Sequence, residues 1–449
     1  MDNSQYVKWF RHSSPYINAH RGKTFVLMLE GDAIADDNFA HIVQDIALLN
    51  SLGVRLVIVH GARPQIDQAL NVLNIKSQFH GELRITDQAA LNAVRAAIGI
   101  VKSDIEARLS IGLPNTPMHG ARIRVVSGNF VTAKPKGVID GVDFQHTGEV
   151  RRIDRRAIGQ QLDQGNIVLL SSCGYSPSGE MFNLAAEDVA TQAAISLAAE
   201  KLILMGEDEG LPSFEKINQK INDKTESEGD SEIISQITTD ELSTLIDSLS
   251  GEHKVHAQSS LTAVKAGINR AHLLSHKVDG ALLQELFTHE GAGTLITAGD
   301  YEQLRQANIE DVGGILELLT PLEDQGVLVR RSREVLETEI NRFKVIERDG
   351  MVIACAALYP HSTELAELAC VAVSSDYRSG QRGDRLLNAI SEQAKAENIN
   401  KIFVLTTRTA HWFIERGFSE ADISALPKER QSLYNFQRNS KIFIKELKN

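Results

Sequence analysis

The stretch Leu368–Leu387, LACVAVSSDYRSGQRGDRLL, decides how the second half of this chain folds. It starts with an apolar run, Leu368–Val373, whose valines are typical of a buried strand. A polar loop, Ser374–Arg382, follows, and Gly383 opens a helix. The apolar face of that helix repeats at helical spacing and comprises Leu386, Leu387, Ile390 and Ala394. The pattern predicts a strand, a loop and a helix in direct succession.

The junction of these three elements predicts an anion-binding site. The first N–H groups of a helix have no partner within the helix, so several of them are exposed where the loop ends. Phosphate and pyrophosphate bind at such positions. An ordinary connection between a strand and a helix is the alternative, because glycine-containing phosphate loops also occur by chance.

The composition is that of a globular protein with more than one domain. The 449 residues suggest two or three domains, and the shares of hydrophobic (42%) and charged (24%) residues are ordinary. The net charge of −12 makes nucleic acids and anionic membranes poor candidate partners. Anionic substrates would therefore need local clusters of basic residues.

Cysteine usage and hydropathy indicate the compartment. Cys173, Cys355 and Cys370 lack the spacing of a metal site or of a disulfide framework, which is typical of a reducing environment. The N-terminus has no apolar segment of the signal-peptide type, and no window approaches the roughly 20 apolar residues that span a bilayer. We expect a cytoplasmic protein.

Strands and helices alternate in the first part of the chain. Thr24–Leu29 and Arg55–Val59 are apolar, strand-like runs, and a glycine follows shortly after each of them, Gly31 and Gly61. The alternation predicts an α/β domain with a parallel-rich sheet and helices on both faces. Ligands of such sheets bind at the carboxyl ends of the strands, where these two glycines stand.

Two breaks divide the chain. Residues 206–232 carry nine acidic residues and three lysines, which predicts a mobile surface insertion. Regular patterns then continue to Thr294, and the mixed strands and helices at the end of the chain predict an α+β domain. The predicted parts are a first domain at 1–294, a linker at 295–300 and a second domain at 301–449.

Five motifs in order make nearly the whole chain similar to one family, the bacterial two-domain N-acetylglutamate synthases. They are VIVHGAR (57–63), GELRIT (81–86), LLQELFTHEGAGT (282–294), VLVRRSR (327–333) and HWFIERGF (411–418). The resemblance implies an amino-acid kinase fold followed by a GNAT acetyltransferase fold. It also implies acetyl transfer from acetyl-CoA to the α-amine of L-glutamate, the first step of arginine biosynthesis, with feedback inhibition by L-arginine and assembly as a homo-oligomer, commonly a hexamer.

The stretch quoted first is similar to the acyl-CoA loop of the GNAT family, Arg/Gln-x-x-Gly-x-Gly/Ala. Arg378 and Gly383 match, and Gln381 replaces the middle glycine. The resemblance implies that pantetheine pairs with the strand backbone as an added strand and that the pyrophosphate binds the N–H groups after it. The implied cosubstrate-binding residues are Cys370, Val371, Val373, Arg378, Gln381, Arg382, Gly383, Asp384, Arg385 and Leu386.

Glutamate carries two carboxylates and needs cations in its site. Arginine suits this role because its planar fork meets a carboxylate bidentately. The substrate residues that the resemblance implies are Leu328, Arg330, Cys370, Arg438 and Ser440, with Leu328 and Cys370 acting through their backbones. Arg331 and Arg333 are alternatives, and a solvated basic surface is another reading of this run.

The resemblance implies direct attack of the glutamate amine on the thioester, without an acyl-enzyme. Glu367 matches the family's proposed base, which takes the ammonium proton directly or through a water. Many GNAT enzymes protonate the leaving thiolate with a tyrosine, but the sequence here is TTRT (406–409), so Thr407 or a water is the candidate. Cys370 is not expected to act as a nucleophile, because it lies in a buried strand without an activating partner. No metal is expected.

The first domain is not expected to catalyse phosphoryl transfer. Amino-acid kinases carry Lys-x-Gly-Gly at the end of the first strand, where this chain has MLEG (28–31). Met28 replaces the lysine that stabilises the transferring phosphoryl group, and Glu30 places an anion against the ATP phosphates. Lys265 matches the second kinase lysine, but one lysine does not restore the reaction.

The first domain is instead expected to bind arginine. The N-terminal helix with Tyr16 and the segment 285–293 resemble the arginine-binding elements of arginine-inhibited acetylglutamate kinases. A guanidinium needs carboxylate and carbonyl acceptors in one plane, which Glu285 and the backbones of Gly291 and Gly293 offer. His272 and Lys201 are candidates for the carboxylate end of the ligand. A solvated helix residue is the alternative reading of Glu285.

Two other functions are weighed against this one. A true acetylglutamate kinase with an accessory domain is opposed by Met28 and Glu30. A non-catalytic amino-acid sensor is opposed by the CoA loop together with Arg330 and Arg438.

Overall fold

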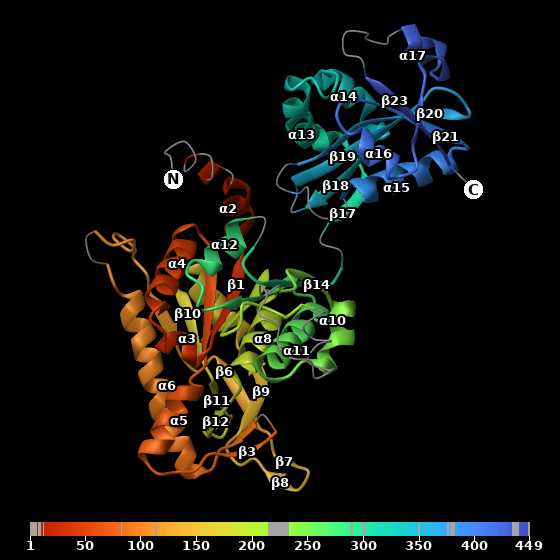
Figure 1. Ribbon diagram of the computed structural model, residues 1–449. Coiled ribbons are helices and arrows are strands. Elements are labelled where there is room, and N and C mark those ends of the chain that lie inside the picture. The colour runs from red at the N-terminus through yellow and green to blue at the C-terminus, as the bar shows by residue number, and fades with distance from the viewer. Residues whose placement is uncertain are drawn as a thin grey trace. The chain divides into compact units, whose positions relative to one another are not determined.

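The chain folds into two compact units, 1–299 and 300–449, which are considered one at a time (Figure 1). None of the described helices is both long enough and apolar enough to cross a bilayer. The computed structural model describes residues 7, 10–11, 13–81, 83–112, 115–213, 233–288, 291–299, 302–348, 351–374, 377, 382–432 and 440–447.

An eight-stranded sheet forms the centre of the first unit (Figure 1). Its strands are, in spatial order, β14 (Gln236–Thr238), β16 (Thr294–Thr297), β15 (Arg270–Ser275), β13 (Lys201–Gly206), β1 (Thr24–Leu29), β2 (Arg55–His60), β10 (Ile167–Ser171) and β5 (Val125–Ser127). All neighbouring strands are parallel except β15 and β16, which are antiparallel. The predicted parallel-rich sheet is confirmed.

The central strands are apolar along almost their whole length. β1, β2 and β13 are buried at nearly every position, because helices cover both faces of the sheet. Helices α8 (Ala186–Leu197) and α11 (Gly251–Lys265) cover one face, and α4 (Phe39–Ser51) and α6 (Gln88–Leu109) cover the other (Figure 1). The carboxyl ends of β1 and β2 therefore meet at one edge, as predicted.

Smaller elements complete the first unit. A four-stranded sheet contains, in spatial order, β12 (Met181–Asn183), β11 (Cys173–Tyr175), β6 (Val131–Pro135) and β9 (Gly148–Ile153). Two hairpins are formed by β3 (Gln78–His80) with β4 (Leu83–Ile85) and by β7 (Val138–Ile139) with β8 (Val142–Asp143). The remaining helices are α2 (Ser14–His20), α3 (Gly31–Ala35), α5 (Arg63–Val72), α7 (Arg155–Asp163), α10 (Thr239–Leu245) and α12 (Ala281–Phe287).

Two predicted boundaries differ from the structure. The strand β16 (294–297) occupies half of the predicted linker and pairs with β14 and β15, and the first unit extends to Gly299. Part of the predicted insertion at 206–232 also belongs to the fold: Leu211 is buried, and its N–H donates to Oγ1 of Thr294 at 2.8 Å. Residues 214–232 lie outside the described residues.

The second unit is built on a seven-stranded sheet (Figure 1). Its strands are, in spatial order, β17 (Gln303–Gln306), β18 (Phe343–Arg348), β19 (Met351–Pro360), β20 (Leu365–Val373), β21 (Lys401–Thr406), β23 (Lys441–Glu446) and β22 (Ser419–Ala421). Only β20 and β21 are parallel. The sheet is the antiparallel-rich one predicted for an α+β domain.

Helices cover both faces of this second sheet. Alternate residues of β19 point to opposite faces: Ala354 and Ala356 pack in one core cluster with α15 (Arg382–Ala396), and Cys355 and Ala357 pack in the other with α13 (Val312–Asp324). The other helices of this unit are α14 (Arg333–Glu339), α16 (Ala410–Ile414) and α17 (Lys428–Ser432).

Candidate active site and effector site

A cleft opens in the second unit where β20 and β21 diverge. Pairing of the two strands runs from Leu365 opposite Lys401 to Glu367 opposite Phe403, and the following residues of both strands line the two sides of the cleft. Its volume is about 570 Å³, enough for the thioester end of a cosubstrate and a small acceptor. Because β20 is uncovered here, its backbone can pair with an extended ligand.

A backbone irregularity marks the point where the cleft begins. Cys370 has a φ of +53°, in the left-handed region that a residue with a side chain rarely adopts. The pairing of β19 with β20 also shifts register between Cys355 and Ala357, which is a β-bulge. Bulges bend a strand and end regular pairing next to active sites. Cys370 thus lies where the sheet changes from a closed to an open edge.

Glu367 is a buried carboxylate on the wall of this cleft. Only 6% of its surface is exposed, and Oε1 accepts a hydrogen bond from Nη2 of Arg430 at 2.8 Å. Nε2 of His361 lies 3.5 Å from the other oxygen. The Arg430 guanidinium thus forms a charge-assisted hydrogen bond with the Glu367 carboxylate.

Among the described residues, Arg331 faces the cleft and the predicted Arg330 does not. Arg331 lines the cleft with its guanidinium carbon 5.7 Å from the Tyr359 ring centre, whereas Arg330 is 79% exposed in its side chain and pairs with Asp324 at 3.0 Å. Arg333 is also exposed and pairs with Glu337. The irregular segment before α14 therefore turns the alternative Arg331 inward and the predicted Arg330 outward.

Hydroxyl groups at the end of β21 offer a proton donor. Thr406 and Thr409 both line the cleft, and their Oγ1 atoms lie 2.8 Å apart. Thr407, the predicted donor, is exposed and does not line the cleft, because the strand ends at Thr406 and the chain turns away. The geometry favours the pair Thr406 and Thr409 over Thr407.

The start of α15 is packed against the rest of the second unit. Gly383 lines the cleft, and a Cβ at this position would lie 2.9 Å from the ring of Trp412. Asp384 forms an ion pair with Arg416, and Leu386 is wholly buried. Arg382 and Arg385 both bind Glu302. These side chains pair with other groups of the second unit, and of the residues named here Gly383 lines the cleft.

The cleft brings together predicted residues from distant parts of the second unit. Those that line it are Leu328, Glu367, Cys370, Val371, Val373, Gly383 and Ser440. Three others, Arg378, Gln381 and Arg438, lie outside the described residues, so their contacts stay predictions. The sequence analysis missed Arg430, which has no motif around it and lies 63 residues from its partner Glu367.

The first unit contains a buried polar chain at the predicted effector site. Nδ1 of His272 lies 2.6 Å from Oε1 of Glu285, and Nζ of Lys201 lies 3.3 Å from Nε2 of the same ring. All three side chains are nearly inaccessible. Neutral His272 donates from Nδ1 to the carboxylate and accepts from the Lys201 ammonium.

The pKa values of His272 and Glu285 are set by burial and by neighbouring charged and hydrogen-bonding groups. Burial and the Lys201 ammonium lower the pKa of His272 to about 4, against the opposing effect of Glu285. Burial alone would raise the pKa of Glu285, but hydrogen bonds from His272 and from the N–H of Ala292 outweigh it and lower the pKa to about 2. Glu285 therefore stays ionised across the physiological range and is not the solvated helix residue of the alternative reading.

The glycines beside Glu285 are required by close approach. A Cβ on Gly291 would lie 2.5 Å from Oε2 of Glu285, and one on Gly293 would lie 2.0 Å from the carbonyl oxygen of Leu273. The N–H groups of Ala292 (2.7 Å) and Gly293 (3.3 Å) both donate to Oε2 of Glu285. Glu285 thus packs directly against the segment that contains Gly291 and Gly293.

The helix α2 lies against the residues that follow Glu285. In α2, Nε2 of His20 is 2.8 Å from the carbonyl oxygen of Leu286, the residue after Glu285. The His20 ring also packs edge-on against Phe287, and buried Tyr16 lies one turn before it. Pro15 stands in the first turn of this helix, where the missing N–H has no cost.

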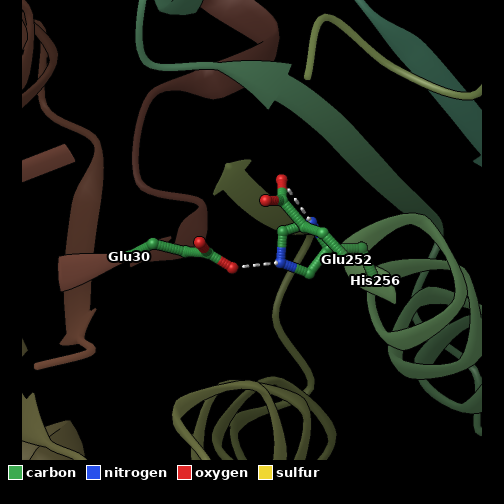
Figure 2. A group of neighbouring side chains, drawn as sticks. All are labelled: Glu30, Glu252 and His256. Carbon is green, nitrogen blue, oxygen red and sulfur yellow. Dashed lines mark hydrogen bonds and ion pairs between the residues drawn. The ribbon is translucent and has the colours of Figure 1, made fainter. Parts of the chain in front are cut away.

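A second polar cluster lies at the carboxyl end of β1, where Glu30 follows the strand. Nε2 of His256 lies 3.0 Å from Oε1 of Glu30, and Nδ1 lies 3.7 Å from Oε1 of Glu252 (Figure 2). Both ring nitrogens thus face carboxylates, which suits an imidazolium better than a metal ligand, because coordination needs a nitrogen without a proton. The predicted second lysine, Lys265, is bonded to Ser243 at 3.0 Å.

The cluster is negatively charged overall. Burial opposes the charged form of His256, but its bond to Glu30 and the charges of Glu30 and Glu252 outweigh this and raise the pKa of the ring. Burial and the Glu30 charge also raise the pKa of Asp32 nearby. An anionic nucleotide would meet repulsion here, as Glu30 predicts.

Known proteins resemble this chain along its whole length. The amino-acid acetyltransferase of Azotobacter vinelandii is 54% identical over 444 residues, covering 98% of this chain and 99% of that protein. That of Ectopseudomonas mendocina is 54% identical over 443 residues, with the same shares covered. The chain belongs to the amino-acid acetyltransferase family.

Both units of this amino-acid acetyltransferase also match separately. The model of the amino acid kinase family matches residues 23–275, and that of the acetyltransferase (GNAT) domain matches residues 339–420. A solved structure of N-acetylglutamate synthase from Neisseria gonorrhoeae, complexed with coenzyme A and L-arginine, is 35% identical and has a TM-score of 0.86. It covers 99% of this chain and is itself covered in full. Acetyl transfer is thereby favoured over the kinase alternative.

The thiol at the bulge of this acetyltransferase is inert. Burial raises the pKa of Cys370 to about 12, so the thiolate that nucleophilic attack requires is absent at neutral pH. We expect Cys370→Ser to retain turnover within about threefold, whereas loss of a covalent nucleophile lowers turnover by several orders of magnitude. Steady-state rates with acetyl-CoA, with Cys173→Ser as a buried-thiol control, would decide, and a thousandfold loss would contradict direct transfer.

The ion pairs of His256 predict a pH-dependent stability of the acetyltransferase. We expect His256→Gln to lower the free energy of unfolding of the first unit by about 3 kcal/mol at pH 6, because two carboxylates lose their buried cation. The folded-state pKa is raised, so this contribution is complete below the unfolded value of about 6.5 and is lost as pH rises through the folded pKa.

Urea unfolding at pH 6, 7.5 and 9 would test this dependence. The matched control is His253→Gln, which alters a more exposed histidine of the same helix that pairs with Asp208 at 3.2 Å. A difference between wild type and His256→Gln that is the same at all three pH values would show that the ring acts without its charge.

Proposed function

We propose that this chain is an N-acetylglutamate synthase, which transfers the acetyl group of acetyl-CoA to the α-amine of L-glutamate in the first step of arginine biosynthesis. The observation that carries the proposal is the cleft beside β20, which is lined by a buried carboxylate, Glu367, and by three arginines, Arg331, Arg408 and Arg430. The similar Neisseria gonorrhoeae enzyme was solved with coenzyme A and N-acetyl-glutamate as well as with L-arginine, which supports this substrate pair.

The residues of the cleft fit direct transfer. The amine nitrogen attacks the thioester carbon, an N–C bond forms and the C–S bond breaks. The glutamate ammonium loses two protons overall: Glu367 accepts the first, directly or through a water, and the second leaves as the amide forms. The thiolate of coenzyme A gains one proton, for which the Thr406 and Thr409 hydroxyls or a water are the donors.

The two carboxylates of glutamate would bind the cations of the cleft. Arg331 and Arg430 are the described candidates, and Arg438 is retained from the family resemblance. Ser440 and the backbones of Leu328 and Cys370 line the same cleft. Bidentate pairing with guanidinium groups would orient the amine toward the thioester.

We further infer that L-arginine binds the first unit at the buried polar chain. A carboxylate has about four lone-pair positions, and Glu285 uses three of them for His272, Ala292 and Gly293, so one remains for a guanidinium. Lys201 and Tyr16 are candidates for the ligand's other groups. Inhibition would require two states of the enzyme that arginine binds unequally.

We infer that the enzyme works as a homo-oligomer, a hexamer by family resemblance, in the cytoplasm. Apolar side chains stand exposed on the first unit, including Val72 (76%), Leu73 (56%) and Ile100 (63%), which supports assembly through this unit. All three cysteines are unpaired, which supports a reducing compartment.

The test is release of the coenzyme A thiol from acetyl-CoA, with and without L-glutamate and L-arginine. Glutamate-dependent release that falls with arginine is the expected result. Release that is indifferent to arginine would refute the effector site while keeping the reaction. Acetyl-CoA binding without release would indicate the non-catalytic sensor, and ATP-dependent phosphorylation would indicate the kinase.

A further inference from the structure

Glu302 is a buried carboxylate held by three arginines at the start of the second unit. Nε of Arg382 lies 2.9 and 3.0 Å from its two oxygens, and Nη1 of Arg385 lies 3.1 Å from Oε2. Nη2 of Arg385 also donates to the Glu302 carbonyl oxygen at 3.1 Å, and Arg348 approaches Oε1 at 3.8 Å. Only 9% of Glu302 is exposed, so water screens these contacts little.

The partners of Glu302 open the helix that follows the cosubstrate loop. Arg382 and Arg385 lie in the first turn of α15, next to Gly383 of the cleft. Nη1 of Arg382 donates to the carbonyl oxygen of Tyr377 at 2.8 Å, and the guanidinium stacks over the buried Tyr377 ring. The chain is thus anchored immediately before and after residues 378–381.

The sign of the charges explains why a carboxylate is needed here. Two guanidinium groups in the first turn repel each other and the positive end of the helix dipole. Glu302 offsets this repulsion and accepts hydrogen bonds from both side chains. Without it, the helix start would lose the contact that fixes its direction.

We propose that Glu302 is a positioning residue for acetyl-CoA. By holding Arg382 and Arg385, it fixes the first N–H groups of α15 where the pyrophosphate of the cosubstrate binds. Glu302 contacts neither substrate and acts only through the two arginines. The inference rests on the proposed function for its reaction, but not for its binding test, which uses coenzyme A alone.

The experiment measures coenzyme A affinity of the full chain by titration calorimetry, together with the KM of each substrate. We expect Glu302→Gln to weaken coenzyme A binding and raise the KM of acetyl-CoA by about tenfold, while kcat and the KM of glutamate change less than about twofold. Glu302→Asp should recover part of the affinity. Glu310→Gln, an exposed carboxylate in the same segment, is the matched control and should leave both values unchanged.

A second variant keeps the test decisive if Glu302→Gln fails to fold. Arg385→Gln removes one of the three arginines around Glu302 and should raise the KM of acetyl-CoA by about threefold, and the double variant should do no more than Glu302→Gln alone. Unchanged coenzyme A affinity in folded Glu302→Gln would overturn the inference, as would a parallel loss for both substrates. Wild type that binds coenzyme A but does not acetylate glutamate would refute the proposed function alone.

Discussion

Replacing Glu367 with glutamine is expected to lower kcat by a factor of about 100 to 1,000, with little change in either KM. Glutamine keeps the size of the side chain and can still accept a hydrogen bond from Arg430, but it cannot take the proton of the glutamate ammonium. The buried position of Glu367 on the cleft wall leaves the substrate amine with no other described carboxylate in the cleft lining. Thiol release at saturating concentrations of both substrates measures the effect.

A matched variant separates catalysis from folding. Glu364→Gln alters an exposed carboxylate just before β20 and should keep kcat at the wild-type value. Equal melting temperatures for both variants would show that the Glu367 change does not unfold the second unit. A Glu367→Gln enzyme that retains more than a fifth of wild-type kcat would remove Glu367 from the role of base.

Replacing Glu285 with glutamine is expected to raise the arginine concentration for half-inhibition by about 10- to 100-fold. The guanidinium of the effector would lose its ionised acceptor, and His272 would lose the bond that orients it. Turnover without arginine should stay within about twofold, since Glu285 belongs to the first unit and the residues that line the cleft belong to the second. Inhibition curves at fixed substrate concentrations give both numbers.

The control for this variant is Asp279→Asn, which changes a carboxylate just before the same helix that is 70% exposed. This variant should be half-inhibited at the same arginine concentration as the wild type. If Glu285→Gln keeps that dependence too, arginine does not use this carboxylate. Calorimetric titration would then show whether arginine still binds, and therefore uses another site, or does not bind at all.

The fold could be predicted in outline because its signals are local. Strands that are covered on both faces have continuous apolar sequences. Three such runs, FVLML, LVIVH and LILMG, lie in β1, β2 and β13. The short run TLIT carries the same apolar signal over only four residues, and the predicted linker begins within it. Its partners β14 and β15 are distant in the sequence, so only the folded sheet shows the pairing.

The site was predictable where it lies on regular elements and not where it lies on irregular ones. Glu367 and Cys370 belong to a strand whose extent the apolar pattern defines. Which of Arg330 and Arg331 faces inward depends on a segment without periodicity, and Thr407 was chosen although the strand ends one residue earlier. Arg430 reaches Glu367 from a five-residue helix, and no spacing rule connects two such positions.

The pairing of Glu30 with His256 also limits which kinase residues the first unit can accept. Glycine at position 30 alone would leave the buried His256 cation facing Glu252 with one partner fewer, and lysine at position 28 would place a charge in a wholly buried apolar position. We infer that each of these substitutions by itself lowers the free energy of unfolding of this unit, which unfolding measurements on Glu30→Gly would test.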